Sequence, residues 1–172
     1  IGGRAYALDE VAEKSDAVLY GFYPGMQGGK AIGEILFGEV NPSGRLPVSL
    51  PRCTGQLPVY YNYKNSYRSM HYYNIPDGAA YTFGYGKSYT NFEYEDISFG
   101  KKDVAIEELH KNGIQVEMSI KNIGEQDGYA VPLVYIAGEQ GSVVRRAKEL
   151  KGFQKIWLKK GESKKEIGRA HV

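Results

Sequence analysis

The chain's 15 tyrosines are concentrated in residues 52–91, and they are the side chains best suited to contact a ligand. A tyrosine ring has an apolar face that can stack on a sugar, and its hydroxyl can hydrogen-bond to sugar hydroxyls. Long segments with little regular periodicity are often functional or form interfaces. We therefore expect this segment to contact carbohydrate, with four candidate substrate-binding residues: Tyr61, Tyr63, Tyr67 and Tyr72. The alternative is that these rings seal the interface between the two parts of the chain.

No other residue set predicts catalysis, a metal or a cofactor. The stretch from Gly25 to Lys30 has the wrong spacing for a phosphate-binding loop, and Ala31 stands where Ser or Thr would bind magnesium. Cys53 has no neighbouring histidine, so we expect a structural thiol. The histidines lack metal-ligand spacing: His71, His110 and His171. The clustered acids are typical of a solvated surface: Asp9, Glu10, Glu13, Glu107 and Glu108.

The overall composition narrows the classes of partner. The 172 residues include 22 basic and 20 acidic side chains, and this net charge of +2 argues against a nucleic-acid partner. Apolar stretches such as residues 17–20 fall far short of the ~20 residues that span a bilayer, so we expect no membrane partner. The single cysteine excludes an internal disulfide framework. The chain begins without methionine, and we expect it to be cut from a longer protein.

Residues 1–50 have the pattern of an α/β segment. A short helical turn is expected at residues 9–14, and the apolar run 17–23, ended by Pro24-Gly25, predicts a buried strand. Four apolar residues lie on one face of a helix that Gly38 closes: Ala31, Ile32, Ile35 and Leu36. The turn at residues 41–44 leads to a short expected strand at residues 45–51.

From Phe92 onward the pattern is all-β. Strands are expected at residues 114–120, 129–136 and 153–158, separated by turns, as in a β-sandwich. Charge is segregated, because residues 92–141 have a net charge of −6 and residues 142–172 have a net charge of +7. Two interpretations are open: strands of opposite charge pair across one sheet, or the basic residues form a docking face.

Three blocks together resemble the C-terminal part of a glycoside hydrolase family 3 enzyme of the β-glucosidase or β-xylosidase type. The first runs from Phe22-Tyr23-Pro24-Gly25 to Asn41-Pro42-Ser43-Gly44-Arg45-Leu46-Pro47. The second is residues 81–92, which read YTFGYGKSYTNF and are similar to the family's Y-P-F-G-Y-G-L-S-Y-T-x-F. The third is Lys148-Glu149-Leu150-Lys151-Gly152-Phe153 with Leu158 and Gly161-Glu162-Ser163. The blocks span nearly the whole chain in the family's order.

The resemblance implies an α/β partial sandwich followed by an all-β immunoglobulin-like (fibronectin type III-like) sandwich. Residues 1–50 would end the α/β domain, residues 51–91 would be a tyrosine-rich linker, and residues 92–172 would form the fibronectin type III-like domain. It also implies that the nucleophilic aspartate lies in an N-terminal (β/α)8 barrel and the acid/base glutamate upstream in the α/β domain. Retaining hydrolysis needs both carboxyl groups, about 5–5.5 Å apart. We therefore expect this chain alone to be inactive, with no catalytic residue of its own.

The implied function is that of a fragment of a retaining β-glycosidase, with β-glucosidase favoured. The expected partners are the barrel, the rest of the α/β domain and, in the intact parent, an oligo- or aryl-β-glycoside. The alternative is a non-catalytic glycan-binding or structural module. After Ser163 the alternation decays, so we expect a truncated last strand that leaves a sandwich edge unpaired. The compartment stays open, with a periplasmic or secreted parent favoured and a cytoplasmic parent as the alternative.

Overall fold

The computed structural model describes residues 1–64, 72–101, 103–138 and 142–170 of the chain. The chain forms two compact units that interleave along the sequence. The first unit consists of Ile1–Val40, Arg45–Gly86 and Gly138–Ala147. The second unit consists of Asn41–Gly44, Lys87–Ala137 and Lys148–Val172.

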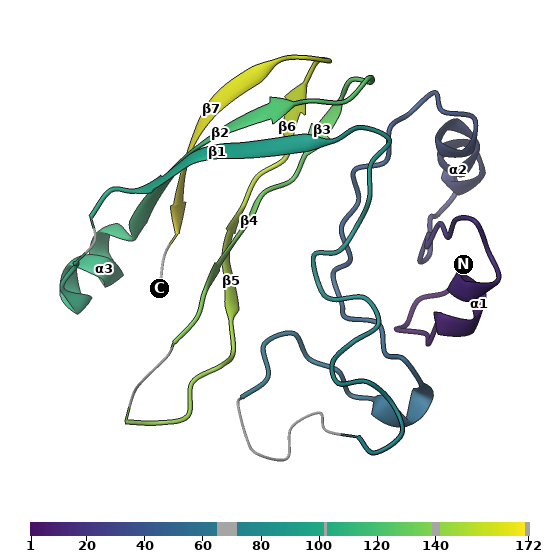
Figure 1. The fold of residues 1–172 in the computed structure, drawn as a ribbon, viewed down its shortest axis with the longest axis horizontal. Coiled ribbons are helices and arrows are strands. Elements are labelled where there is room, and N and C mark those ends of the chain that lie inside the picture. The colour runs from purple at the N-terminus through teal and green to yellow at the C-terminus, as the bar shows by residue number, and fades with distance from the viewer. Residues whose placement is uncertain (65–71, 102, 139–141, 171–172) are drawn as a thin grey trace. The chain divides into compact units, whose positions relative to one another are not determined.

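The first unit has three short helices: α1 (Asp9–Glu13), α2 (Gly28–Leu36) and the 3-10 helix η1 (Thr54–Gln56) (Figure 1). The expected helices at residues 9–14 and 31–38 are therefore confirmed. A Cβ atom at Gly28 would lie 2.5 Å from Cγ of Pro24, so the start of α2 admits only glycine. At the other end, Gly38 has φ +78°, a left-handed conformation that glycine adopts without strain and that ends the helix.

The buried strand expected at residues 17–23 is not formed. Val18 and Leu19 have 44% and 42% of their surface exposed, and the segment belongs to no strand. One backbone contact is made here, from the Gly2 N–H to the Phe22 carbonyl at 3.0 Å. A strand needs hydrogen-bonded neighbours along its length, and the described residues supply none for this run. The apolar pattern is therefore present without the sheet that would bury it.

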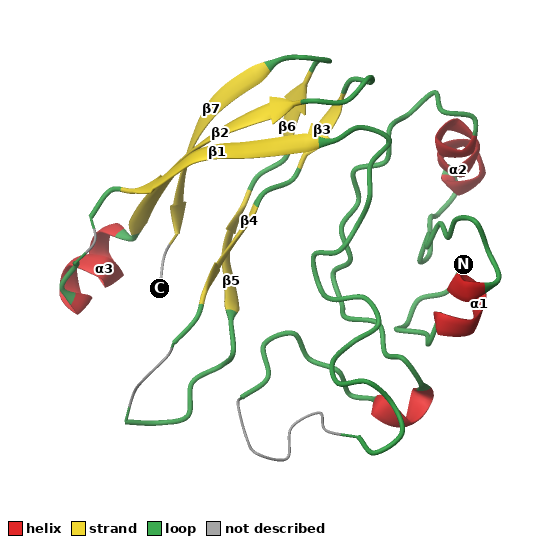
Figure 2. Cartoon of the chain, in the orientation of Figure 1, coloured by secondary structure: helices red, strands yellow, loops and turns green. Residues whose placement is uncertain are grey.

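The second unit is a sandwich of antiparallel strands (Figure 2). One sheet has the order β1-β2-β7, and two further pairs are β3-β6 and β4-β5. Their bounds are β1 Phe92–Phe99, β2 Ile114–Asn122, β3 Gly128–Ala130, β4 Leu133–Ile136, β5 Glu149–Phe153, β6 Ile156–Leu158 and β7 Ser163–Ala170, with helix α3 (Ile106–Asn112) between β1 and β2. The strand expected at residues 114–120 is confirmed as β2.

The other two expected strands are each divided in the structure. The run 129–136 breaks at Val131-Pro132 into β3 and β4, and the run 153–158 breaks at Gln154-Lys155 into β5 and β6. Proline has no N–H to donate to a ladder, so Pro132 ends one pairing before the next begins. As a result β3 pairs with β6, and β4 pairs with β5.

The core of this unit follows from strict alternation on β2. Val116, Met118 and Ile120 point inward and are buried. They pack with buried residues of the facing strands: Ala130, Ile156 and Leu158. Because successive side chains on a strand face opposite ways, the same alternation leaves Glu117 and Ser119 on the outer face.

The residues after Ser163, where the alternation decays, form strand β7 up to Ala170. Strand β7 pairs with β2 continuously, from Lys121↔Ser163 to Ile114↔Ala170. Backbone pairing with β2, rather than apolar alternation, forms this strand.

The pairing of β2 with β7 also bears on the two interpretations of the segregated charge, because Lys165 Nζ lies 3.0 Å from Glu117 Oε2 across the two strands. Opposite charges do pair across one sheet, as the first interpretation predicts.

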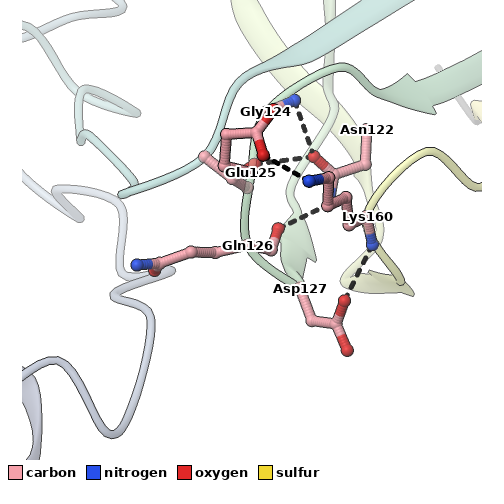
Figure 3. A network of polar contacts seen from close by, with 7 residues as sticks. Asn122, Gly124, Glu125, Gln126, Asp127 and Lys160 are labelled. Atoms are coloured by element: carbon pink, nitrogen blue, oxygen red, sulfur yellow. Dashed lines mark hydrogen bonds and ion pairs between the residues drawn. The ribbon is translucent and has the colours of Figure 1, made fainter.

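A buried asparagine joins the strands at one end of the sandwich (Figure 3). Asn122 is fully buried, and its side-chain oxygen accepts hydrogen bonds from Thr90 Oγ1 at 2.6 Å and from the Gly124 N–H at 3.2 Å. Its side-chain nitrogen donates to the carbonyls of Gln126, at 2.8 Å, and Leu158, at 3.3 Å. A single side chain thus satisfies polar groups from three separate parts of the unit.

We predict that Asn122→Ala lowers the free energy of unfolding of the second unit by about 3 kcal/mol, because it leaves several buried polar groups without partners. Urea unfolding followed by the fluorescence of the chain's single tryptophan, Trp157, measures this change. Lys121→Ala, an exposed neighbour on β2, is the matched control. Equal stability of the two variants would contradict the prediction.

A pH-dependent contribution is expected from Glu162. The Lys159 N–H donates to Glu162 Oε2 at 2.7 Å, and this bond lowers the pKa of the carboxyl, with help from the Lys164 ammonium at 3.4 Å. The folded pKa is therefore below the ordinary value of 4.5. Ionised Glu162 stabilises the fold above that value, and the stabilisation disappears as the pH falls through the folded pKa.

Glu162→Gln should therefore be less stable than the unchanged chain near about pH 7, and the difference should shrink toward about pH 3. Urea unfolding at a series of pH values tests this. A stability difference that stays constant over the whole series would show that the charge of Glu162 plays no part.

Candidate functional site

The tyrosine-rich segment is held at its ends by two paired stretches of chain. The Leu46 N–H donates to the Tyr85 carbonyl and the Gly84 N–H to the Leu46 carbonyl, both at 2.8 Å. Further along, the Leu50 N–H donates to the Tyr81 carbonyl at 2.8 Å. The strand expected at residues 45–51 is not formed as a regular ladder, because residues 47–48 bend and the run makes one isolated bridge, Leu50↔Tyr81. Pro47 and Pro51 have no N–H to donate to a ladder.

Two buried polar side chains strengthen this pairing. Ser49 Oγ accepts a hydrogen bond from the Phe83 N–H at 3.1 Å. The Gln56 side chain accepts a hydrogen bond from the Arg52 N–H and donates one to the Gly78 carbonyl, both at 2.8 Å. It therefore connects its own turn to a carbonyl 22 residues further along the chain. Buried side chains with satisfied polar atoms fix backbone geometry. These hydrogen bonds therefore fix the backbone at the ends of the tyrosine-rich segment.

The structure places three of the four predicted tyrosines. The Tyr61 ring stacks on Phe83, with centroids 4.1 Å apart and planes at 17°. Tyr63 is half-buried, and its carbonyl accepts a hydrogen bond from the Ala147 N–H at 2.8 Å. Tyr72 has 40% of its surface exposed. Tyr67 lies outside the described residues.

A second loop, which the sequence did not predict as part of the site, meets this segment. Residues 142–147 follow β4 and precede β5, yet Arg146 Nη1 donates to the Asn62 carbonyl at 3.2 Å. The backbones of Arg146 and Lys64 also form an isolated antiparallel β-bridge. The side chains of Val143 and Val144 are exposed beside it along the loop. No periodicity could have revealed this contact, because it joins a side chain to a backbone carbonyl 84 residues away.

An aromatic cluster surrounds Tyr20 near the start of the chain. Its ring lies 4.5 Å from that of Phe22 in an edge-on arrangement, and its hydroxyl donates to the Arg4 carbonyl. Burial raises the pKa of the Tyr20 hydroxyl, and the neighbouring tyrosines Tyr6 and Tyr23 add to the effect. Tyr20 therefore stays protonated as a hydrogen-bond donor, a structural role.

Three of the acidic candidates form ion pairs. Glu10 pairs with Lys14 and Glu108 with Lys101, each at 2.5 Å, while Asp9 lies 3.6 Å from Arg52. Cys53 is a free, half-buried thiol. Within the described ranges, no three His, Cys, Asp or Glu side chains gather closely enough to hold a metal ion. His71 and His171 lie outside those ranges.

None of the helices in the described part of the chain is both long enough and apolar enough to cross a membrane.

Comparison with known proteins identifies the two parts of the chain. Residues 1–89 match the family model "Glycosyl hydrolase family 3 C-terminal domain", and residues 130–166 match "Fibronectin type III-like domain". A partial α/β sandwich followed by a fibronectin type III-like sandwich defines the C-terminal part of a multidomain glycoside hydrolase. The chain belongs to glycosyl hydrolase family 3.

Similar proteins are much longer than this chain. A periplasmic beta-glucosidase of Salmonella typhimurium is 37% identical over 95% of this chain, which covers 22% of that protein. A beta-xylosidase of Formosa agariphila is 35% identical over 95% of this chain and is likewise covered to 22%. The crystal structure of a Listeria innocua beta-glucosidase in complex with isofagomine superimposes with a TM-score of 0.90 at 37% identity; the alignment spans 99% of this chain and 25% of that one. The chain thus spans about a fifth to a quarter of these relatives.

Proposed function

We propose that the protein containing this chain is a retaining β-glycosidase that hydrolyses O-glycosyl bonds in carbohydrate catabolism, with β-glucosidase as its activity. Family membership and the names of the similar proteins support this assignment. In this proposal the nucleophile and the acid/base lie upstream, and the chain scaffolds the site that they form. The observation that carries it is the anchored tyrosine segment, which is positioned by chain pairing and offers no paired carboxylates of its own.

We also propose the domain division and the partners. Residues 1–50 end the α/β domain, residues 51–91 link, and residues 92–172 form the fibronectin type III-like domain. The partners are the N-terminal (β/α)8 barrel and the rest of the α/β domain, with an oligo- or aryl-β-glycoside as substrate. Exposed apolar side chains of the first unit support contact with such parts, because surfaces of this kind are usually covered: Leu19, Met26, Leu36 and Phe37.

The division of labour can be tested directly. We predict that the 172-residue chain alone gives no hydrolysis of an aryl β-glucoside or aryl β-xyloside, because retaining hydrolysis requires two carboxyl groups that flank the bond. The full-length protein should hydrolyse at least one of them with retention of configuration, which proton NMR of the first-formed sugar detects. Activity of the chain alone, or an inactive full-length protein that still binds glycans, would contradict the proposal.

Four tyrosines are proposed to line the sugar site: Tyr61, Tyr63, Tyr67 and Tyr72. The exposure of Tyr72 supports a direct contact, and the stack of Tyr61 on Phe83 supports a role in holding the segment. Ring contacts with a ligand are worth about 1 kcal/mol, or roughly a fivefold change in affinity.

We therefore predict that Tyr72→Ala in the full-length protein raises KM for an aryl β-glycoside about fivefold with little change in kcat. Tyr94→Ala on β1 is the matched control, because Tyr94 is equally exposed, at 40%, but lies in the sandwich. Michaelis kinetics of both variants provide the test. Equal KM values for the two variants would remove Tyr72 from the sugar site.

A further inference from the structure

The outer face of the β3-β6 pair carries an aromatic couple that the proposed active site does not use. Tyr129 and Trp157 lie directly opposite each other in the register, with ring centroids 4.8 Å apart in an edge-on arrangement. Their strand neighbours are buried, namely Ala130 beside Tyr129 and Ile156 and Leu158 on either side of Trp157. The alternation therefore directs both rings outward, and Trp157 has 41% of its surface exposed.

Lysine ammonium groups accompany the rings of this face. Lys155 Nζ lies 4.3 Å from the Tyr129 ring centroid, and Lys148 Nζ lies 4.9 Å from that of Tyr135 on the adjoining strand β4. These contacts differ from those of Lys165, which faces a carboxylate on β2. A lysine held against a ring keeps its positive charge and its N–H donors at the surface.

The site is rigid before any ligand arrives. The inner side chains of β3 and β6 belong to the core, and Lys164 from β7 donates to the Trp157 carbonyl at 2.7 Å. Preorganised aromatic surfaces bind with little loss of side-chain entropy. Lys148 and Lys155 belong to the same unit as the rings, and Lys155 is exposed. Exposed ring surface with a lysine ammonium group beside it complements a ligand that has apolar ring faces and negative charge.

We propose that this face, defined by Tyr129, Lys155 and Trp157, is a second carbohydrate-binding site that takes glycan chains bearing carboxylates, such as uronic acid groups. A sugar ring stacks on Trp157, and a neighbouring carboxylate pairs with the Lys155 ammonium. Single-stranded nucleic acid also combines rings with negative charge, but the chain's net charge of +2 gives no electrostatic basis for binding a polyanion of that density. All residues of the site belong to the second unit, and none of them is part of the tyrosine segment proposed to contact substrate.

The test compares two polymers that differ only in charge: xylan bearing glucuronic acid side groups, and the same xylan after chemical reduction of its carboxyl groups to alcohols. Affinity gel electrophoresis or calorimetry with the full-length protein measures binding to each. We expect the acidic polymer to bind about fivefold more tightly than the reduced one. Lys155→Gln should abolish this preference, while Trp157→Ala should weaken binding to both polymers about tenfold.

Matched controls are Lys121→Gln and Tyr94→Ala, an exposed lysine and an exposed tyrosine of the same sandwich, which should bind like the unchanged protein. Lys155→Gln alters only an exposed side chain, so the test stands even if Trp157→Ala unfolds, which circular dichroism reveals. Equal binding of both polymers, no effect of Lys155→Gln, preference for a single-stranded oligonucleotide, or Trp157-dependent self-association would each overturn the proposal. Because binding is measured without turnover, a failure here is distinct from a failure of the glycosidase assignment.

Discussion

The buried amide of Asn122 is the interaction on which the sandwich most depends. An asparagine side chain has both donor and acceptor atoms. Here its oxygen accepts from Thr90 and Gly124, and its nitrogen donates to the Gln126 and Leu158 carbonyls. No apolar residue could replace it without leaving those groups unsatisfied at a buried position. The close packing around Asn122 also requires glycine at position 124, because a Cβ atom there would come within 2.2 Å of Thr90 Oγ1.

A second asparagine performs a related task at the first turn of the family motif. Asn41 Nδ2 donates to the Asp127 carbonyl at 3.0 Å, and its Oδ1 accepts from Ser88 Oγ and from the Tyr89 N–H at 2.7 and 2.8 Å. Asn41 therefore joins both halves of the motif pattern, the turn at 41–44 and the segment 81–92, to the β2-β3 connection. These residues of the family motifs, Asn41, Ser88 and Tyr89, thus connect segments of the chain by hydrogen bonds.

In the function proposed above, this chain holds segments in position while the catalytic carboxyl groups lie upstream. The tyrosine-rich stretch is such a segment, because hydrogen bonds of the Ser49 and Gln56 side chains anchor it. The apolar run at residues 17–23 is the complementary case, because its pattern is that of a sheet strand and its neighbours are absent from the described chain. A surface in that state is adapted to packing against further protein.

The sequence alone determined a helix over residues 31–36 that ends at Gly38, strand β2, the β-sandwich class and, through its motifs, the family. These features depend on local periodicity, glycine positions and long ordered motifs, which are visible in one dimension. Only the tertiary structure decided that the runs 129–136 and 153–158 divide, that β7 pairs along all of β2, and that residues 142–147 meet the tyrosine segment. The physical reason is that these features depend on hydrogen bonds between backbone groups far apart in the chain. Every residue type except proline can both donate and accept such bonds, so the order of side chains does not show which distant segments pair.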